Sequence, residues 1–239
     1  MKKRTSAILL SLLLASMAAA ADEPEELLVT AVRTDKLTVP GASLRRPADY
    51  LLQQIKVSND SPDEKVRKEE ILQTLRLMEN AAERDKGIEL ALLADYRTVV
   101  PMKPDVAALK MTRGNRVDTS EVTVCIKVKI IPGASNAPAL FERLKSFPNS
   151  IKPAGRSALD VSGNPELTLI NPDQYREQVV KLYAADSRLV TSALGADYRV
   201  VTKGIDRQLQ WVRDGLLDVV IYIPYEYDVI PAQVTSYSR

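Results

Sequence analysis

The sequence predicts an α+β fold in which two long helices pack on one face of an antiparallel sheet. Two stretches show the helical spacing of apolar residues, each with a proline at its start and a glycine after its end. The stretch 121–131 alternates apolar and polar residues, as a strand with one buried face does. Both halves of the chain follow the order strand, long helix, strand, which favours helices segregated to one side of a sheet.

Residues 1–21 have the three parts of a secretory signal peptide. A basic start at 2–4 precedes an apolar core at 7–14, and small residues then lead to an expected cleavage after Ala20 or Ala21. The apolar core is shorter than the roughly 20 residues that a membrane span needs, and no later stretch is long and apolar enough. No cysteine follows the cleavage region, so we expect a periplasmic protein without a lipid anchor or a membrane span.

Composition excludes several classes of chemistry. The chain has no His, which excludes Ser-His-Asp and Cys-His catalysis and imidazole metal ligands. One Cys excludes an intrachain disulfide and a cysteine-built zinc site. The net charge of +2 becomes −1 without the three basic residues of the signal peptide, so nothing favours a nucleic acid partner. We therefore expect no cofactor and no metal.

The first long helix follows a strand at 50–57. Ser61 is the expected N-cap, Pro62 occupies the first helical position, and Glu64 completes a capping box. Gly87 marks the expected end. The apolar positions that share the buried side of this helix are Ile71, Leu75, Met78 and Ala82.

Five segments of different character follow this helix. A strand at 88–100 precedes a long loop at 101–120, which contains two prolines and a glycine. Next come the alternating strand at 121–131, a short helix at 137–147 and a short strand at 166–170. Loops of this length are often functional, so the 101–120 loop is a candidate lid.

The second long helix has its own boundary signals. Asn171 is the expected cap, Pro172 the first helical residue and Gly195 the stop. Beyond it the sequence predicts a strand at 197–203, a turn region at 204–215 and a final strand at 216–229.

This order of elements resembles the SIMPL-domain family over roughly residues 45–230. The resemblance rests on ELTLINPDQYREQVVKLYAADSRLVTSALGADYRVVTKGI with LLDVVIYIPYEYDV, and on EVTVCIKVKI followed by ALFERLKSF. The family consists of exported bacterial proteins of mostly unassigned function. The resemblance implies a periplasmic α+β protein, sometimes a ring-like homo-oligomer, linked with envelope or stress physiology. It carries no catalytic residues to this chain.

The expected organisation is a signal peptide, a leader segment at 22–48, a SIMPL-like domain at 49–230 and a polar tail at 231–239. An alternative division separates this domain into two halves, 49–100 and 121–230. Within the leader, EELLVTAVR at positions 25 to 33 resembles the energy-coupling box of TonB-dependent receptors. This chain is too short for the barrel of such a receptor. Two interpretations remain: a β-prone leader, or a coupling tail that adds a strand to a partner.

Cys125 is the candidate reactive thiol. It lies in the middle of the alternating strand, on the face opposite the valines, and Lys127 lies two residues along on the same face. A cation near a thiol lowers its pKa, which would favour thiol chemistry. The alternative is a small, buried residue that only fills space.

Four aromatic residues are candidates for an interface. Trp211 lies in the turn region near Arg207 and Arg213, and is expected either to anchor an interface or to pack over the end of the sheet. Pro224 interrupts the last strand, so this strand is expected to lie at an edge or to be broken there. The tyrosines on this strand, which could pair with another subunit, are Tyr222, Tyr225 and Tyr227.

The favoured function is therefore that of a non-enzymatic periplasmic protein that acts through self-association as a homo-oligomer, or through an unidentified envelope protein partner. One alternative is a small-ligand binding module with the 101–120 loop as its lid. The other is an enzyme that uses Cys125 or acidic residues.

Overall fold

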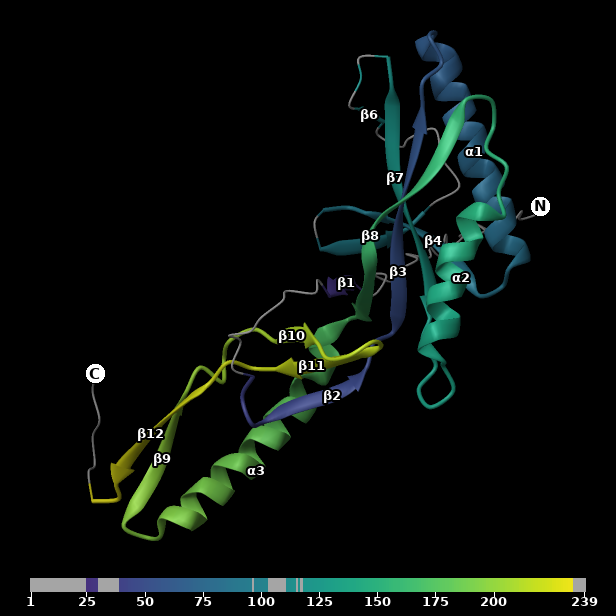
Figure 1. Cartoon of the computed structure of the whole chain (residues 1–239). Helices are drawn as coiled ribbons and strands as arrows, with labels where there is room; N and C mark the ends of the chain where they lie inside the picture. Colours follow the sequence, from purple (N-terminus) through teal and green to yellow (C-terminus); the bar gives the residue numbers. More distant parts are fainter. Residues whose placement is uncertain are drawn as a thin grey trace, which may run out of the picture.

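The computed structural model describes residues 25–29, 39–95, 97–102, 111–114, 116 and 118–233. It confirms an α+β architecture with a large antiparallel sheet and three α-helices in this part of the chain. The molecule is elongated and has two lobes (Figure 1). A large lobe contains the seven-stranded sheet with two of the helices, and a small lobe contains the remaining sheets and the third helix.

The helices are α1 (Glu64–Arg84), α2 (Ala137–Asn149) and α3 (Arg176–Leu194), the last preceded by a 3-10 turn, η2 (Pro172–Tyr175). The strands of the large lobe are β1 (Glu26–Val29), β3 (Tyr50–Asn59), β4 (Ile88–Leu93), β5 (Thr98–Pro101), β6 (Thr112–Arg113), β7 (Ser120–Lys129) and β8 (Ser157–Ile170). The strands of the small lobe are β2 (Ser43–Pro47), β9 (Tyr198–Lys203), β10 (Gln210–Arg213), β11 (Asp218–Tyr222) and β12 (Glu226–Pro231).

The large sheet closes on itself. Its strands follow the order β3-β8-β1-β5-β4-β7, and β7 pairs with β3 as well, so these strands form a ring. The short strand β1 sits between β5 and β8 and is antiparallel to both. Both β1 and β2 come from the segment that the sequence analysis separated as a leader, and each is a strand of a different sheet.

The side chains of β7 alternate between two faces, as its sequence predicts, but the predicted wetter face is partly wrong, since Cys125 and Lys127 on it are buried as well. Val124 and Ile126 face the main core, which α1 and α2 cover. Cys125 faces the inside of the ring, where it packs with Leu28 and Leu52 in a second, smaller core. The main core continues into the small lobe. The α1 residues buried in it include the predicted Ile71, Leu75, Met78 and Ala82, and β11 adds Val219 and Ile221.

The first helix begins two residues later than expected. Asp63 is its N-cap, and its carboxylate accepts the N–H groups of Lys65 and Val66. Ser61 instead donates its hydroxyl to Glu70 at 2.9 Å, while its own N–H donates to the side chain of Asn59. A carboxylate is also the better partner for the positive end of the helix, because it carries a full negative charge.

The helices are distributed differently from the prediction. Only one long helix, α1, packs on the large sheet, and it shares that face with the shorter α2. The second long helix, α3, packs on β2 and β9 in the small lobe. The predicted packing of both long helices on one face is therefore wrong, since the strands that follow α3 form separate sheets: β10 and β11 with β2, and β9 with β12.

Three predicted strand boundaries also need correction. The segment 88–100 is a hairpin, because Asp95 caps a turn between β4 and β5. The predicted strand at 166–170 is the end of the longer β8, which passes the Gly-Asn-Pro sequence at 163–165 through an irregularity in its pairing with β3. The turn region at 204–215 contains β10. The predicted break at Pro224 is confirmed, since β11 and β12 lie on either side of it.

The two lobes are joined by hydrogen bonds of main-chain and side-chain groups as well as by the shared core. The N–H of Ala48 donates to Leu217 at 2.9 Å. The Asp49 carboxylate accepts the N–H of Ile170 at 2.8 Å. The Arg213 guanidinium of β10 donates to the carbonyl of Pro165 in β8 at 2.8 Å. These contacts fix the small lobe against the end of the large sheet.

A buried ion pair holds β1 in the ring. Lys127 is 5% exposed and Glu26 is 6% exposed, and the lysine Nζ lies 2.5 Å from Glu26 Oε2. The second carboxylate oxygen of Glu26 accepts the hydroxyl of Thr168 at 2.6 Å. The same ammonium lies 4.2 Å from the centre of the Tyr50 ring and 3.4 Å from a carboxylate oxygen of Glu89. Every polar atom of this pair thus has a partner, which is what makes its burial tolerable.

We expect Lys127→Met to lower the free energy of unfolding by about 3 to 5 kcal/mol, because it leaves the Glu26 carboxylate buried without its cation. The double variant Glu26→Leu/Lys127→Met should recover most of this loss. Lys129→Met, at an exposed position of the same strand, is the matched control. Urea unfolding measures the free energy of unfolding of all three variants. Equal unfolding midpoints for Lys127→Met and Lys129→Met would contradict the role given to the Glu26–Lys127 ion pair.

Candidate functional site: a cleft between the lobes

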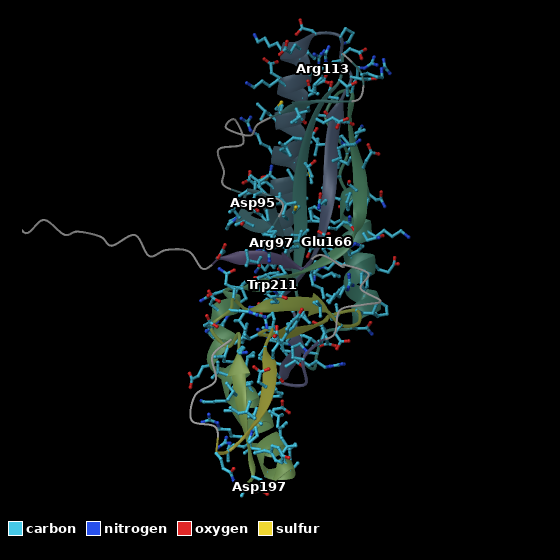
Figure 2. All side chains as sticks on the ribbon, turned by 90° about the vertical axis from the view of Figure 1, so that its left-hand side faces the viewer. Asp95, Arg97, Arg113, Glu166, Asp197 and Trp211 are labelled. Atoms are coloured by element: carbon cyan, nitrogen blue, oxygen red, sulfur yellow. The ribbon has the colours of Figure 1, made fainter. Side chains whose placement is uncertain are left out.

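A cleft of about 620 Å³ lies where the two lobes meet. One wall comes from the large lobe and includes Leu27 of β1 and Arg97 of the β4–β5 turn. The other wall comes from the small lobe and includes residues 208–212 and Tyr222. Figure 2 shows Arg97 and Trp211 near this junction. We call this feature the waist cleft.

The wall from the large lobe is held by Asp95. Its Oδ1 accepts the N–H groups of Arg97 and Thr98, both at 2.7 Å, and its Oδ2 accepts the hydroxyl of Thr98 at 3.0 Å. These hydrogen bonds, those from the backbone first, lower the pKa of the Asp95 carboxyl. The carbonyl of Arg97 accepts the N–H of Leu28 at 2.7 Å. The turn that carries Arg97 is therefore fixed both internally and to β1.

Trp211 supplies the centre of the other wall. Its ring is half-buried on β10, and the Arg97 guanidinium carbon lies 5.2 Å from the ring centre. At this distance the cation is attracted by the negative face of the indole. The neighbouring Arg213 donates to the carbonyls of Gly215 and Leu216 as well as to Pro165, which holds the end of β10 in place.

The structure separates the four aromatic candidates into two pairs. Trp211 and Tyr222 both line the waist cleft. Tyr225 and Tyr227 instead pack with Tyr183 of α3, at ring distances of 4.9 and 6.2 Å from it, and both hydroxyls donate to Asp186. Burial, together with the Asp186 carboxylate, raises the pKa of Tyr227. This pair therefore joins β12 to α3 within the chain.

Cys125 lies in an environment unlike that of a reactive thiol. Its side chain is fully buried inside the ring. Burial raises the pKa of the thiol to about 12, and the negative charges of Glu166 and Glu26 add to this effect. Lys127, which the sequence placed on the same face, is bound to Glu26. A nucleophilic cysteine needs a lowered pKa and access to solvent, so the surroundings of Cys125 favour the space-filling interpretation.

We expect the thiol of Cys125 to resist a soluble disulfide reagent at pH 8 in the folded protein, because a pKa of about 12 leaves almost no thiolate. In urea the same thiol should react at the rate of an ordinary cysteine. The spectroscopic release of thionitrobenzoate measures both rates. Rapid labelling of the folded protein, with no accompanying loss of structure, would revive the thiol hypothesis.

Other predictions fall wholly or partly outside the described residues. The signal peptide 1–21 lies outside them, as do 103–110 of the predicted lid and 234–239 of the polar tail. Of the segment that resembles the coupling box, 26–29 forms β1, and 30–33 lie outside the description. Within the described ranges, no cluster of His, Cys, Asp or Glu is arranged to hold a metal ion. None of the helices there is both long and apolar enough to cross a bilayer.

No family model, curated protein or solved structure matches this chain. The site therefore rests on its own geometry. Sequence reasoning identified Trp211 and Tyr222 but missed Leu27 and Arg97, which the fold brings from distant segments to the same cleft. Asp95, which lies two residues before Arg97, was a local signal, because an Asp two or three residues before backbone N–H donors is typical of a turn.

Proposed function

We propose that this chain is an exported, SIMPL-like periplasmic protein that binds a protein partner at the waist cleft and performs no catalysis. The observation that carries the proposal is Trp211, which lies in an open cleft against the guanidinium of Arg97. Trp, Tyr and Arg are the residue types that dominate the energetics of protein interfaces. The waist cleft offers all three, with Tyr222 as the third.

The order of elements supports the SIMPL-like part of the proposal. Within the described residues, α1 has 21 residues and lies between β3 and β4, and α3 has 19 residues and follows β8 through the 3-10 turn η2 before β9. The alternating strand β7 and the short helix α2 follow one another between them, as in the central segment of that family. The signal-peptide pattern at 1–21 supports export.

We expect Trp211→Ala to abolish recovery of the natural partner from an envelope extract, because it removes the anchor and its contact with Arg97. Leu216→Ala is the matched control, since Leu216 is 58% exposed and lies outside the waist cleft. Affinity capture on the immobilised mature protein, followed by mass spectrometry, measures recovery. Undiminished recovery by the Trp211 variant would contradict binding at this cleft.

A second candidate function, self-association into a homo-oligomer, is favoured by the surface of the small lobe. We call α3, β9 and β12 the arm. Val179 is the one residue of α3 that is buried. The large apolar side chains that the arm leaves exposed are Leu182, Leu189, Leu194, Tyr198 and Val229. Large apolar side chains left exposed on one part of a molecule are candidates for a surface that a second molecule covers, and a second copy of this chain offers the same side chains.

We expect Leu189→Glu to convert an oligomer of the mature protein to a monomer, since Leu189 is 67% exposed on the arm and a charge there would have to be buried in the contact. Val161→Glu, at a half-exposed apolar position of β8 in the large lobe, is the control. Size-exclusion chromatography with light scattering gives the mass. A wild-type protein that is monomeric at high concentration would exclude this candidate.

A further inference from the structure

The edge of β10 is open. The three-stranded sheet of the small lobe has the order β10-β11-β2, so β11 occupies one side of β10. Among the described residues, no strand pairs with its other side. A strand edge of this kind presents N–H and C=O groups that a further strand can satisfy.

The waist cleft runs along this open edge. Three consecutive residues of β10, Gln210, Trp211 and Val212, line it, and the two residues before the strand continue this wall. Successive side chains of a strand point to opposite faces, so a cleft over one face would be lined by alternate residues only. Consecutive lining therefore places the backbone of β10 in the wall. The opposite wall includes Leu27 of β1, a strand that contacts β10.

The charges around the cleft are unbalanced. Glu25, Asp95 and Asp173 line it together with a single cation, Arg97. The carboxylate of Asp95 is occupied by its own turn. Glu25 and Asp173 are exposed at the cleft, and Arg97 lies over Trp211. A ligand that carries positive charge is thus favoured over one that carries negative charge, because opposite charges attract across a partly desolvated cleft.

We propose that the waist cleft binds an extended, basic segment of a partner protein, which adds to β10 as a further strand. An apolar side chain of the segment packs on Trp211, and a Lys or Arg side chain lies between Glu25 and Asp173. Main-chain hydrogen bonds to β10 supply affinity, and these side-chain contacts supply specificity. The inference rests on the proposed function, and adds to it the chemistry and the conformation of the bound segment.

Trp211 is the only Trp of the chain, so its fluorescence reports directly on the cleft. The probes are three capped peptides: one alternates Val and Lys, the second has Glu in place of Lys, and the third is the Lys peptide N-methylated at two adjacent central residues. The methyl groups block both edges of the peptide while keeping its charge. We expect the Lys peptide to bind at least about tenfold more tightly than either of the others, equivalent to about 1.4 kcal/mol.

A Glu25→Gln/Asp173→Asn variant should bind the Lys and Glu peptides with nearly equal affinity. Lys65→Gln/Glu69→Gln, on the exposed side of α1, is its control.

Equal binding of the Lys peptide and its N-methylated form would overturn strand addition, and equal binding of the Lys and Glu peptides by the wild-type protein would overturn the preference for basic segments. Absence of any response to the Lys peptide would overturn the inference as a whole. None of these outcomes decides the proposed function. Affinity capture of the natural partner with the Trp211→Ala variant tests that function separately.

Discussion

The ion pair between Glu26 and Lys127 determines how the large lobe is built. A strand of four residues has little apolar area of its own to bury, yet β1 completes the ring between β5 and β8. The buried carboxylate fixes its register, because a slip of one residue would place Leu27 against the ammonium and leave the Glu26 carboxylate without its cation. Ion pairs of this kind contribute little net stability. We therefore assign this pair a role in specifying one pairing of β1.

The register of β1 in turn determines the waist cleft. With Glu26 directed into the ring, Leu27 faces the cleft. The N–H of Leu28 holds the carbonyl of Arg97, so the β4–β5 turn is positioned by the same strand. From the other lobe, Arg213 holds β10 to β8. Trp211 and Arg97 meet because two independent sets of contacts bring their strands to the same junction, and a change in either set would separate them.

The periodic spacing of apolar residues predicted which side of a helix or strand is buried. The apolar face of β7 and the buried stripe of α1 are correct residue by residue, since each element turns its apolar side to the same core, whereas the burial of Cys125 and Lys127 on the other face of β7 depends on the closure of the ring. The pairing of β1 was not predictable, because the partners of Glu26, Lys127 and Thr168, lie 101 and 142 positions further along the chain. Trp211 was recognised by its residue type, but its strand was taken for a turn. Four residues with a neighbouring glycine give no clear period, and only the pairing with β11 defines β10.

The two lobes are stabilised by different interactions. The two proposed binding surfaces, the waist cleft and the arm, lie on different elements. The large lobe is stabilised by a continuous apolar core, whereas the distal arm depends on tyrosine hydroxyls that share Asp186 and buries little apolar area. Leu189 lies on α3 in the arm, and Trp211 lies on β10 at the junction (Figure 2). Because these sites are on different elements and share no described contact, substitutions at the two should act additively. The proposed partner binding and the proposed self-association can accordingly be tested separately by single variants of the same protein.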